Sequence, residues 1–349
     1  MNTIFKIENF IRENVKLMKA YSSARDEFTD IAEVYLDANE NPFNNGINRY
    51  PDPYQKELKK RISEIKSIPI KNLMLGNGSD EVLDLIFRVF CEPKLDNIIY
   101  TPPTYGMYKV LGEMNDVDLR PSHLDNRFTL NVEDILDQID PRTKLIFLCS
   151  PNNPSGNTMP EEQVKELLVR SNCLVVIDEA YIDFSKESSY INKLDMYPNL
   201  IVCQTLSKAW GMAGIRLGIC YASEAIISVL NKLKPPYNVN VLTQQKALAS
   251  LENIADFKSN LEEILKERNK LRSSLEQIDF VKLIYPSDAN FWLVKVDDAN
   301  KRYKQLLQAG IVVRNRTNEV LCDNCLRFTV GTPRENEKLI KALKKLQQS

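Results

Sequence analysis

Short apolar runs alternate with amphipathic stretches through the middle of this chain, and no other feature constrains its fold more tightly. The runs have the composition of buried strands, and they lie at residues 73–75, 97–100, 144–149, 174–177, 200–204 and 217–221. The stretches between them, such as 80–90 and 161–170, repeat apolar residues at helical spacing. This alternation predicts an α/β fold, in which a mostly parallel sheet is covered by helices on both faces.

The carboxyl-terminal part of the chain has a different pattern. A helical stretch over residues 241–277 precedes a helix near 301–309 and strand-like segments at 281–285, 290–296, 311–314 and 326–330. This order predicts a smaller α+β domain. We therefore expect an N-terminal arm that packs on the small domain, a large domain, a linking helix and the small domain itself, at residues 1–45, 46–240, 241–280 and 281–349.

Composition removes several classes of function. The 46 basic and 47 acidic residues nearly balance, so no basic excess points to nucleic acid. No run of about 18 apolar residues is present to cross a membrane, and the first residues lack the apolar core of a signal peptide. We therefore expect a cytoplasmic protein that binds neither nucleic acid nor membranes.

Histidine and cysteine chemistry is equally restricted. The only histidine, His123, lies in a loop-like stretch, which argues against a His-based catalytic triad and a His-rich metal site. The seven cysteines are an odd number spread through apolar segments, which is not the pattern of a disulfide framework. Cys322 and Cys325 have C-x-x-C spacing, but no second pair accompanies them. We interpret this pair as part of a turn between two strands and expect no metal.

Polar residues follow four of the predicted strands, at the position where open α/β sheets bind their ligands. They occupy segments 76–81, 150–156, 178–181 and 205–218. The first segment, Gly-Asn-Gly-Ser-Asp-Glu, opens a predicted helix whose free N–H groups suit an anion. The other three bring an amide, carboxylates, hydroxyls, Lys208 and Arg216 to the same edge.

Pyridoxal phosphate requires this combination of groups. The cofactor needs a lysine for a Schiff base, an acid beside its pyridinium nitrogen and donors for its phosphate. Lys208, Asp178 and Arg216 can fill these three roles, and an arginine offers phosphate a fork of fixed donors. The sequence therefore predicts a pyridoxal-phosphate enzyme whose catalytic residue is Lys208.

Three motifs in these segments resemble those of class II aminotransferases of pyridoxal-phosphate fold type I. They are Asn153-Pro154-Ser155-Gly156, Asp178-Glu179-Ala180-Tyr181, and Ser207-Lys208 followed by Arg216. The resemblance implies that Lys208 carries the cofactor and moves the proton during transfer, while Asp178 pairs with the ring nitrogen. It also implies a cis bond at Asn153-Pro154. The other implied cofactor contacts are the ring-oxygen donors Asn153 and Tyr181, the stacking residue Tyr105, and the phosphate-binding residues Ser79, Asp80, Thr205, Ser207 and Arg216.

Further segments narrow the resemblance to histidinol-phosphate aminotransferases, namely 12–15, 20–25, 36–42, 48–53, 311–315 and 325–332. That family transfers an amino group between L-glutamate and imidazole-acetol phosphate in histidine biosynthesis, giving L-histidinol phosphate and 2-oxoglutarate. The resemblance implies that Arg327 binds the substrate carboxylate or phosphate, that Arg314 and Tyr21 assist with the phosphate, and that Asn39 lies near the substrate. It also implies a homodimer, in which Tyr50 reaches the cofactor phosphate of the other subunit.

Other functions remain open at this point. Threonine-phosphate decarboxylases and aromatic aminotransferases share the fold and much of the pattern. Losing carbon dioxide instead of a proton requires a different orientation of the scissile bond, which these motifs do not specify. A non-catalytic effector-binding module, as in some transcription regulators, is the alternative from another class. Such modules usually carry a DNA-binding segment, and the first forty or so residues have neither a helix-turn-helix pattern nor a basic excess.

Overall fold

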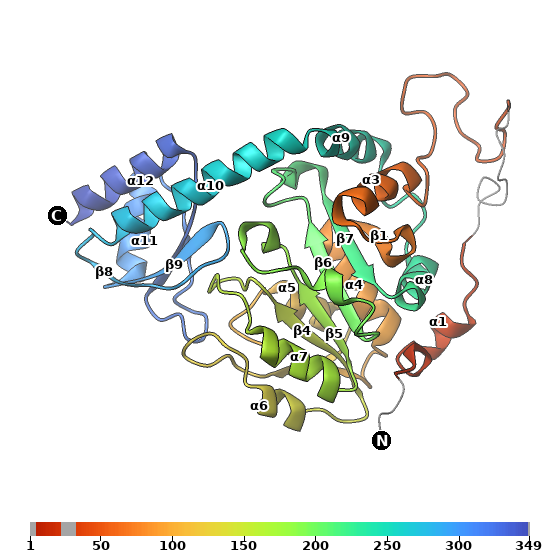
Figure 1. Cartoon of the computed structure of the whole chain (residues 1–349), viewed down its shortest axis with the longest axis horizontal. Helices are drawn as coiled ribbons and strands as arrows, with labels where there is room; N and C mark the ends of the chain where they lie inside the picture. Colours follow the sequence, from red (N-terminus) through yellow and green to blue (C-terminus); the bar gives the residue numbers. More distant parts are fainter. Residues whose placement is uncertain (1–4, 22–32, 348–349) are drawn as a thin grey trace.

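Seven strands form the central sheet of the large domain in the computed structural model, which describes residues 5–21 and 33–347 (Figure 1). Their order across the sheet is β1-β7-β6-β5-β4-β2-β3. Their bounds are β1 (Leu73–Asn77), β2 (Asn97–Tyr100), β3 (Asp118–Pro121), β4 (Thr143–Cys149), β5 (Leu174–Asp178), β6 (Leu200–Thr205) and β7 (Leu217–Ala222). All pairs from β3 through β2, β4 and β5 to β6 are parallel, which confirms the predicted α/β fold with a mostly parallel sheet.

Strand β7 departs from the predicted pattern, because it runs antiparallel to both β6 and β1. Residues 206–216, which join β6 to β7, contain only the 3-10 turn η5 (Ala213–Ile215). A parallel return would need a crossover of about a dozen residues or more, usually a helix. The amino end of β7 therefore lies at the same sheet edge as the carboxyl end of β6. The edge strand β3 was also not predicted, because its sequence Asp-Leu-Arg-Pro has no apolar run.

Helices cover both faces of the sheet, and each face has its own apolar cluster. On one face pack α3 (Lys56–Lys66), α6 (Val132–Asp137), α7 (Glu161–Arg170) and α9 (Val241–Glu252). On the other pack α4 (Gly78–Phe90), α5 (Met107–Met114) and α8 (Glu224–Leu233). Strand residues alternate between the clusters, so that Val175 and Ile177 face the first, while Leu174 and Val176 face the second. Because both faces are buried, the inner strands such as β5 are apolar over most of their length, whereas the edge strand β3 is not.

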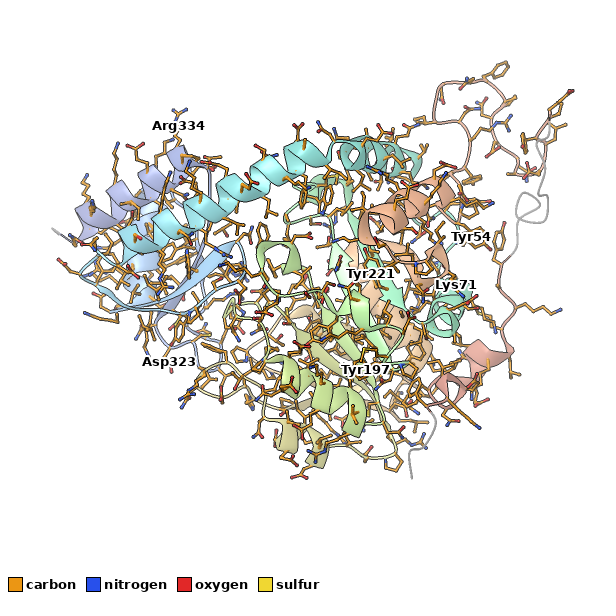
Figure 2. All side chains as sticks on the ribbon, in the orientation of Figure 1. Tyr54, Lys71, Tyr197, Tyr221, Asp323 and Arg334 are labelled. Atoms are coloured by element: carbon orange, nitrogen blue, oxygen red, sulfur yellow. The ribbon has the colours of Figure 1, made fainter. Side chains whose placement is uncertain are left out.

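Side chains fill the space between the sheet and its helices (Figure 2). Tyr221 of β7 lies inside this packing and is fully buried, whereas Arg334 is exposed on the small domain. Short 3-10 turns complete the large domain, namely η2 (Ile70–Asn72), η3 (Ile182–Phe184) and η4 (Tyr190–Lys193). The only histidine, His123, is exposed between β3 and α6, in agreement with its predicted loop position.

The small domain is built on a four-stranded antiparallel sheet in the order β10-β11-β9-β8. Its elements are β8 (Val281–Ile284), β9 (Phe291–Val296), α11 (Ala299–Gln308), β10 (Arg314–Asn315), β11 (Cys325–Thr329) and α12 (Pro333–Leu346). Helices α11 and α12 pack their apolar sides on this sheet around Trp292 and Phe328. Cys322 lies between β10 and β11, and Cys325 begins β11; both thiols are buried and free.

Two helices join the domains, where the sequence predicts one. Helix α9 ends at Asn253, whose side chain then caps the first turn of α10 (Ile254–Leu275) by accepting a hydrogen bond from the N–H of Asp256. Helix α10 runs from the large domain to the small domain and packs on α12 (Figure 1). Among the helices of residues 5–21 and 33–347, none is both long and apolar enough to cross a membrane.

Residues 5–17 of the N-terminal arm pack on the large domain, which corrects for this segment the expectation that residues 1–45 pack on the small domain. Here η1 (Ile7–Asn9) and α1 (Glu13–Leu17) place Ile7 and Val15 in the cluster shared by α4 and α8, and Phe10, between these two elements, joins the same cluster. The N–H of Arg12 donates to the carbonyl of Val89 at 3.1 Å. These side chains need a buried surface, and α4 and α8 provide one. Residues 22–25 of the predicted segment 20–25 lie outside the described residues.

Candidate active site

Every predicted cofactor-binding residue except Tyr50 lines one cavity at an edge of the large sheet. Asn153 and Lys208 follow the carboxyl ends of β4 and β6, and Asp178 is the last residue of β5, whereas Arg216 precedes β7 and reaches this edge because β7 is antiparallel. The cavity is lined by Ser79, Asp80, Tyr105, Cys149, Asn153, Asp178, Ala180, Tyr181, Thr205, Ser207, Lys208 and Arg216. The topology of the sheet thus brings together residues from across more than a hundred positions of the chain.

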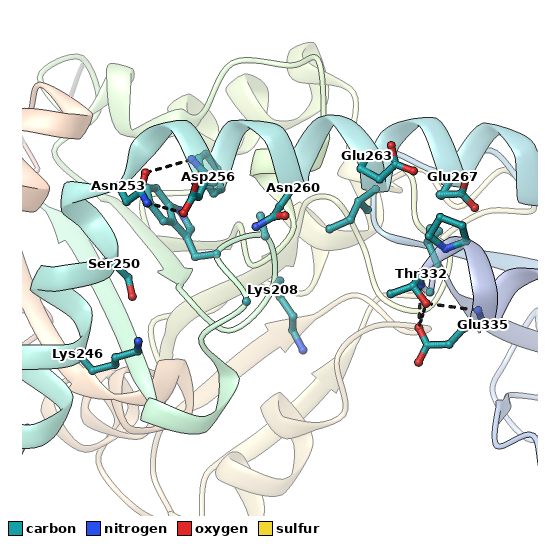
Figure 3. Close-up of a pocket in the computed structure, with 18 of the residues that line it drawn as sticks. Lys208, Lys246, Ser250, Asn253, Asp256, Asn260, Glu263, Glu267, Thr332 and Glu335 are labelled. Carbon is teal, nitrogen blue, oxygen red and sulfur yellow. Dashed lines mark hydrogen bonds between the residues drawn. The ribbon is translucent and has the colours of Figure 1, made fainter.

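Lys208 lies between this cavity and a larger groove along α10 (Figure 3). Its Nζ atom is 5.5 Å from the centroid of the Tyr181 ring. Partial burial lowers the pKa of Lys208, and the positive charge of Arg327 lowers it further, while Asp178 acts in the opposite direction. The surroundings therefore favour a neutral amine, which is the form that accepts a proton.

Asp178 is the most unusual charge in the cavity, because its carboxylate is buried without a cationic partner. The hydroxyl of Tyr108 donates to it at 2.9 Å, and the N–H of Ala180 donates at 3.0 Å. Burial nevertheless raises the pKa of Asp178 to about 6. In the described part of the chain, no lysine or arginine forms an ion pair with this carboxylate. A cation placed in the cavity would supply the missing charge.

Tyr108 contacts this site and was not predicted. It lies on α5, three residues after Tyr105, and its hydroxyl donates to Asp178. Tyr105 also lines the cavity, and its own hydroxyl donates to Asp80 at 3.0 Å. Tyr108 lies in the first turn of α5 and Tyr105 just before this helix, and tyrosines at such positions are also typical of a hydrophobic core, so the sequence pattern alone did not identify Tyr108 as a site residue.

The start of α4 forms a cradle for an anion. Gly78 adopts a φ of +80°, and a Cβ atom at this position would lie 2.6 Å from the guanidinium of Arg216. Gly218 of β7 sits directly beneath, where a Cβ atom would lie 2.3 Å from the backbone N of Ser79. Two glycines thus allow the helix start, β7 and Arg216 to approach closely. The free N–H groups of the first turn and this guanidinium together suit a phosphate.

Asn153 connects the cavity to the small domain. Its Oδ1 atom accepts a hydrogen bond from a terminal nitrogen of Arg327 and a longer one, 3.4 Å, from Arg316. Arg327 lies on β11, with its guanidinium 5.0 Å from the centroid of the Phe291 ring. Arg316 was not predicted, although it follows Arg314 by two positions, the spacing that puts two strand residues on one face. The bond between Asn153 and Pro154 is cis, as predicted.

Five predicted residues are not among those that line the cavity, and one of them, Arg327, contacts Asn153 of the lining. The other four are Tyr21, Asn39, Arg314 and Tyr50. Tyr21 and Asn39 are exposed, and Arg314 is exposed opposite Arg327 in the β10–β11 pair. Tyr50 is 52% exposed and stacks on Tyr237, with ring centroids 4.5 Å apart. The roles predicted for these four residues remain predictions.

The larger groove beside Lys208 has a volume of about 700 Å³ and lies between α10, residues 208–211 and the amino end of α12 (Figure 3). In this view the side chain of Lys208 extends away from α10. Trp210 stacks on Phe257 of α10, with ring centroids 3.8 Å apart, and this contact joins the turn that contains Lys208 to α10.

In the described residues, no cluster of histidine, cysteine, aspartate or glutamate could hold a metal ion.

The cavity fits pyridoxal phosphate by the chemistry of its residues. A buried carboxylate without a cation matches the pyridinium nitrogen, and the glycine-lined helix start with Arg216 matches the phosphate. The amide of Asn153 and the phenol of Tyr181 can donate to the ring oxygen, while the amine of Lys208 is placed to hold the cofactor.

Comparison with known proteins extends this result beyond the cavity. The sequence profile of the family described as "Aminotransferase class I and II" matches residues 21–343. A histidinol-phosphate aminotransferase from Flavobacterium johnsoniae is 58% identical over 349 residues, which cover 99% of this chain and 100% of that protein. The crystal structure of a histidinol-phosphate aminotransferase from Clostridium acetobutylicum has a TM-score of 0.80 and 27% identity, covering 86% of this chain and 91% of that one. A third protein, the histidinol-phosphate aminotransferase from Sinorhizobium meliloti in complex with pyridoxal 5'-phosphate, shares the fold with a TM-score of 0.78, 22% identity and coverage of 86% and 83%.

Proposed function

The chain belongs to the class I and II aminotransferases, whose cofactor is pyridoxal phosphate, and we propose that it acts as a histidinol-phosphate aminotransferase. In this reaction an amino group passes between L-glutamate and imidazole-acetol phosphate, giving L-histidinol phosphate and 2-oxoglutarate. The observation that carries the proposal is the extent of the similarity to the Flavobacterium relative. It spans 99% of the chain, and so includes the small domain and the arm as well as the cofactor cavity.

Lys208 is the catalytic residue of this proposal. Pyridoxal phosphate, when bound, supplies a protonated ring that withdraws electrons from the reacting carbon of the substrate. The neutral Nζ of Lys208 accepts the proton from that carbon and returns a proton during the transfer, acting as a general base and then a general acid. The lowered pKa of Lys208, caused first by burial, supports the neutral form.

The remaining cavity residues bind and orient the cofactor in this proposal. Asp178 keeps the ring nitrogen protonated, because a buried carboxylate favours a cation beside it. Asn153 and Tyr181 donate to the ring oxygen, and Tyr105 stacks on the ring. The phosphate is held by the start of α4, at Ser79 and Asp80, together with Thr205, Ser207 and Arg216.

The substrates of this reaction share an anion far from the reacting amine, and Arg327 is the residue that binds it. Its guanidinium reaches Asn153 from the small domain, so a substrate carboxylate or phosphate bound there lies beside the cofactor. Asn39 lies near the substrate in the same proposal, with Tyr21 and Arg314 assisting at the phosphate.

The proposed enzyme is a cytoplasmic homodimer in which Tyr50 reaches the cofactor phosphate of the other subunit. Exposed apolar side chains on the segment before Tyr50 support a subunit interface there, because exposed apolar surface of this kind marks contact sites. These are Val34, Leu36, Phe43 and Ile47, which are 69%, 87%, 79% and 57% exposed.

The proposal is tested by loading the protein with pyridoxal phosphate and L-glutamate, then adding imidazole-acetol phosphate. We expect formation of histidinol phosphate and 2-oxoglutarate in equal amounts. Parallel assays offer threonine phosphate, with carbon dioxide as the readout, and aromatic amino acids. No turnover of imidazole-acetol phosphate, together with release of carbon dioxide from threonine phosphate, would assign the decarboxylase function instead. Cofactor binding without turnover of any of these substrates would favour an effector-binding module.

A further inference from the structure

Arg316 carries a second guanidinium, beside that of Arg327, where the small domain meets the cavity at Asn153. It directly follows β10, and its N–H donates to the carbonyl of Cys325 at 2.9 Å, which continues the pairing with β11. Since strand side chains alternate between faces, Arg314 and Arg316 lie on the same face, and Arg327 lies opposite Arg314 on that face. The two arginines on this face differ in burial: Arg314 is exposed, whereas the side chain of Arg316 is only 16% exposed.

The hydrogen bonds of Arg316 leave part of its guanidinium unused. One terminal nitrogen donates to Glu319 at 2.9 Å, and the other makes the 3.4 Å contact with Asn153. The Nε atoms of both Arg316 and Arg327 are buried without a hydrogen-bond partner. A buried donor without a partner is costly, so two of them side by side call for an acceptor that the described chain does not supply.

The charges around these two arginines are also unbalanced. Both guanidiniums donate to the same neutral oxygen of Asn153, and Glu319 is the only carboxylate that either of them contacts among the described residues. Burial lowers the pKa of Arg327, and the charge of Arg316 lowers it further. Both positive charges also act on Tyr181, where they oppose the rise in pKa that burial causes. Arg316 therefore acts on a residue that lines the cofactor cavity, and the pair has excess positive charge.

We propose that Arg316 determines specificity for the phosphorylated substrate, by adding a second guanidinium to the anion site at Arg327. This inference rests on the proposed function and names a residue that it left out. A carboxylate carries one negative charge and can be bound by the fork of Arg327 alone. A phosphate monoester carries about −1.5 to −2 at neutral pH and has three acceptor oxygens, so it can use both forks. Arg316 thus favours histidinol phosphate over glutamate at a site where both must bind.

The test compares four variants of the cofactor-loaded enzyme, Arg316→Gln, Arg316→Lys, Arg314→Gln and Glu319→Gln. We expect Arg316→Gln to lower kcat/KM for histidinol phosphate by roughly 10- to 100-fold, because charge-assisted hydrogen bonds are lost, and to change kcat/KM for glutamate by less than about threefold. The loss should lie in KM. Arg316→Lys should restore part of it, since the charge returns without the fork. Arg314→Gln should cost histidinol phosphate less than Arg316→Gln does.

Glu319→Gln separates a substrate role from a structural ion pair. If Arg316 binds substrate, removing the charge of Glu319 frees its guanidinium and leaves KM for histidinol phosphate equal or lower. If Glu319→Gln and Arg316→Gln instead lose the same thermal stability and the same activity toward both substrates, the ion pair is structural and the proposal is wrong. A larger loss for Arg314→Gln than for Arg316→Gln also overturns it.

Inorganic phosphate makes this test independent of the proposed function. Its binding to the cofactor-loaded protein can be followed through the cofactor absorbance, whether or not histidinol phosphate is a substrate. We expect Arg316→Gln to weaken phosphate binding by at least about fivefold relative to the unchanged protein. Equal phosphate affinity in the two proteins refutes the role of Arg316, whereas absent turnover of histidinol phosphate by the unchanged protein refutes the proposed function.

Discussion

The cofactor end of the site and its substrate end are built in different ways. The cofactor end consists of residues that directly follow or precede strands of one sheet, at Asn153, Asp178, Thr205 to Lys208 and Arg216. The proposed substrate end consists of Arg316 and Arg327, which belong to the small domain and donate to Asn153 of the cavity. The residues of the cofactor end are held in place by backbone pairing within a buried sheet. The residues of the substrate end are held in place by the way that the small domain packs against the large domain.

This difference predicts how each end responds to change. A substitution at the cofactor end should remove cofactor binding or chemistry for every substrate alike. A substitution at the substrate end should leave the cofactor in place and alter the choice of substrate. The following experiments test that separation, from the largest expected effect to the smallest.

Replacing Lys208 with Ala should remove amino transfer almost completely. The amine is the general base of the proposal, and such groups contribute roughly 10²- to 10⁴-fold in rate, so we expect a loss at or beyond the upper part of that range. The visible absorbance of the lysine-bound cofactor should disappear as well. Lys246→Ala is the matched control, because Lys246 lines the neighbouring groove and not the cofactor cavity. An unchanged spectrum in Lys208→Ala would contradict the role of this lysine.

Replacing Arg327 with Ala should weaken both glutamate and the phosphorylated substrate by roughly 10²- to 10³-fold in kcat/KM, because a partly buried charged contact is lost. Cofactor affinity should change far less, since Arg327 comes from the small domain. Titration with pyridoxal phosphate and steady-state kinetics measure the two quantities separately. Equal losses in both would show that the two ends are not separate.

The stability of the cofactor-free protein should fall as pH rises from about 4 to about 7. Burial raises the pKa of Asp178 to about 6 and that of Glu179 to about 7, so the folded protein binds more protons than the unfolded chain in this window. Stability then decreases with rising pH, and Asp178 alone accounts for ~2–3 kcal/mol. Urea unfolding at several pH values measures this slope. Asp178→Asn should flatten it, and a slope that is unchanged in this variant would contradict the shifted pKa.

Replacing Gly218 with Ala should weaken cofactor binding by roughly tenfold, because overpacking here costs on the order of 1–3 kcal/mol and moves the start of α4 away from β7. The added Cβ would lie 2.3 Å from the backbone of Gly78 and Ser79. Gly214→Ala is the control, since nothing lies within 4 Å of a Cβ at that position. We expect KM for both substrates to stay within about twofold once the cofactor is saturating. A selective change in substrate KM would break the separation between the two ends.

The cofactor end could be predicted from the sequence because its residues directly follow buried strands. An apolar run such as 174–177 identifies its own carboxyl end, and Asp178 comes next. The direction of β7 could not be predicted from its apolar residues, which are the same for either direction, so the placement of Arg216 rested on resemblance to a family. The contact of Tyr108 with Asp178 joins α5 to β5 across long-range packing that no local pattern describes.

The substrate end could be predicted only in part, for the same physical reason. Arg327 was predicted to bind substrate, and the structure places it on Asn153. Arg316 was not predicted, because its burial depends on the turn between β10 and β11 and on the approach of Asn153 from the other domain. The arm was expected on the small domain, whereas its apolar residues, such as Val15, find a buried surface on α4 and α8. Patterns along the chain indicate that a segment is amphipathic, but not which surface buries its apolar side.

The chain bends at Asn253 between α9 and α10, so α10 is a separate helix that joins the two domains. With 22 residues, α10 is ~33 Å long; it begins after Asn253, and its far half packs in the small domain. A tilt of about 5° at Asn253 would displace the far end of a helix of that length by about 3 Å. That displacement is comparable to the 3.4 Å that now joins Arg316 to Asn153. A rotation of that size would change the contact between the arginine pair and Asn153, and it would also disturb the contacts of α10 with the large domain, where Phe257 stacks on Trp210 and Arg268 donates to the carbonyl of Phe184.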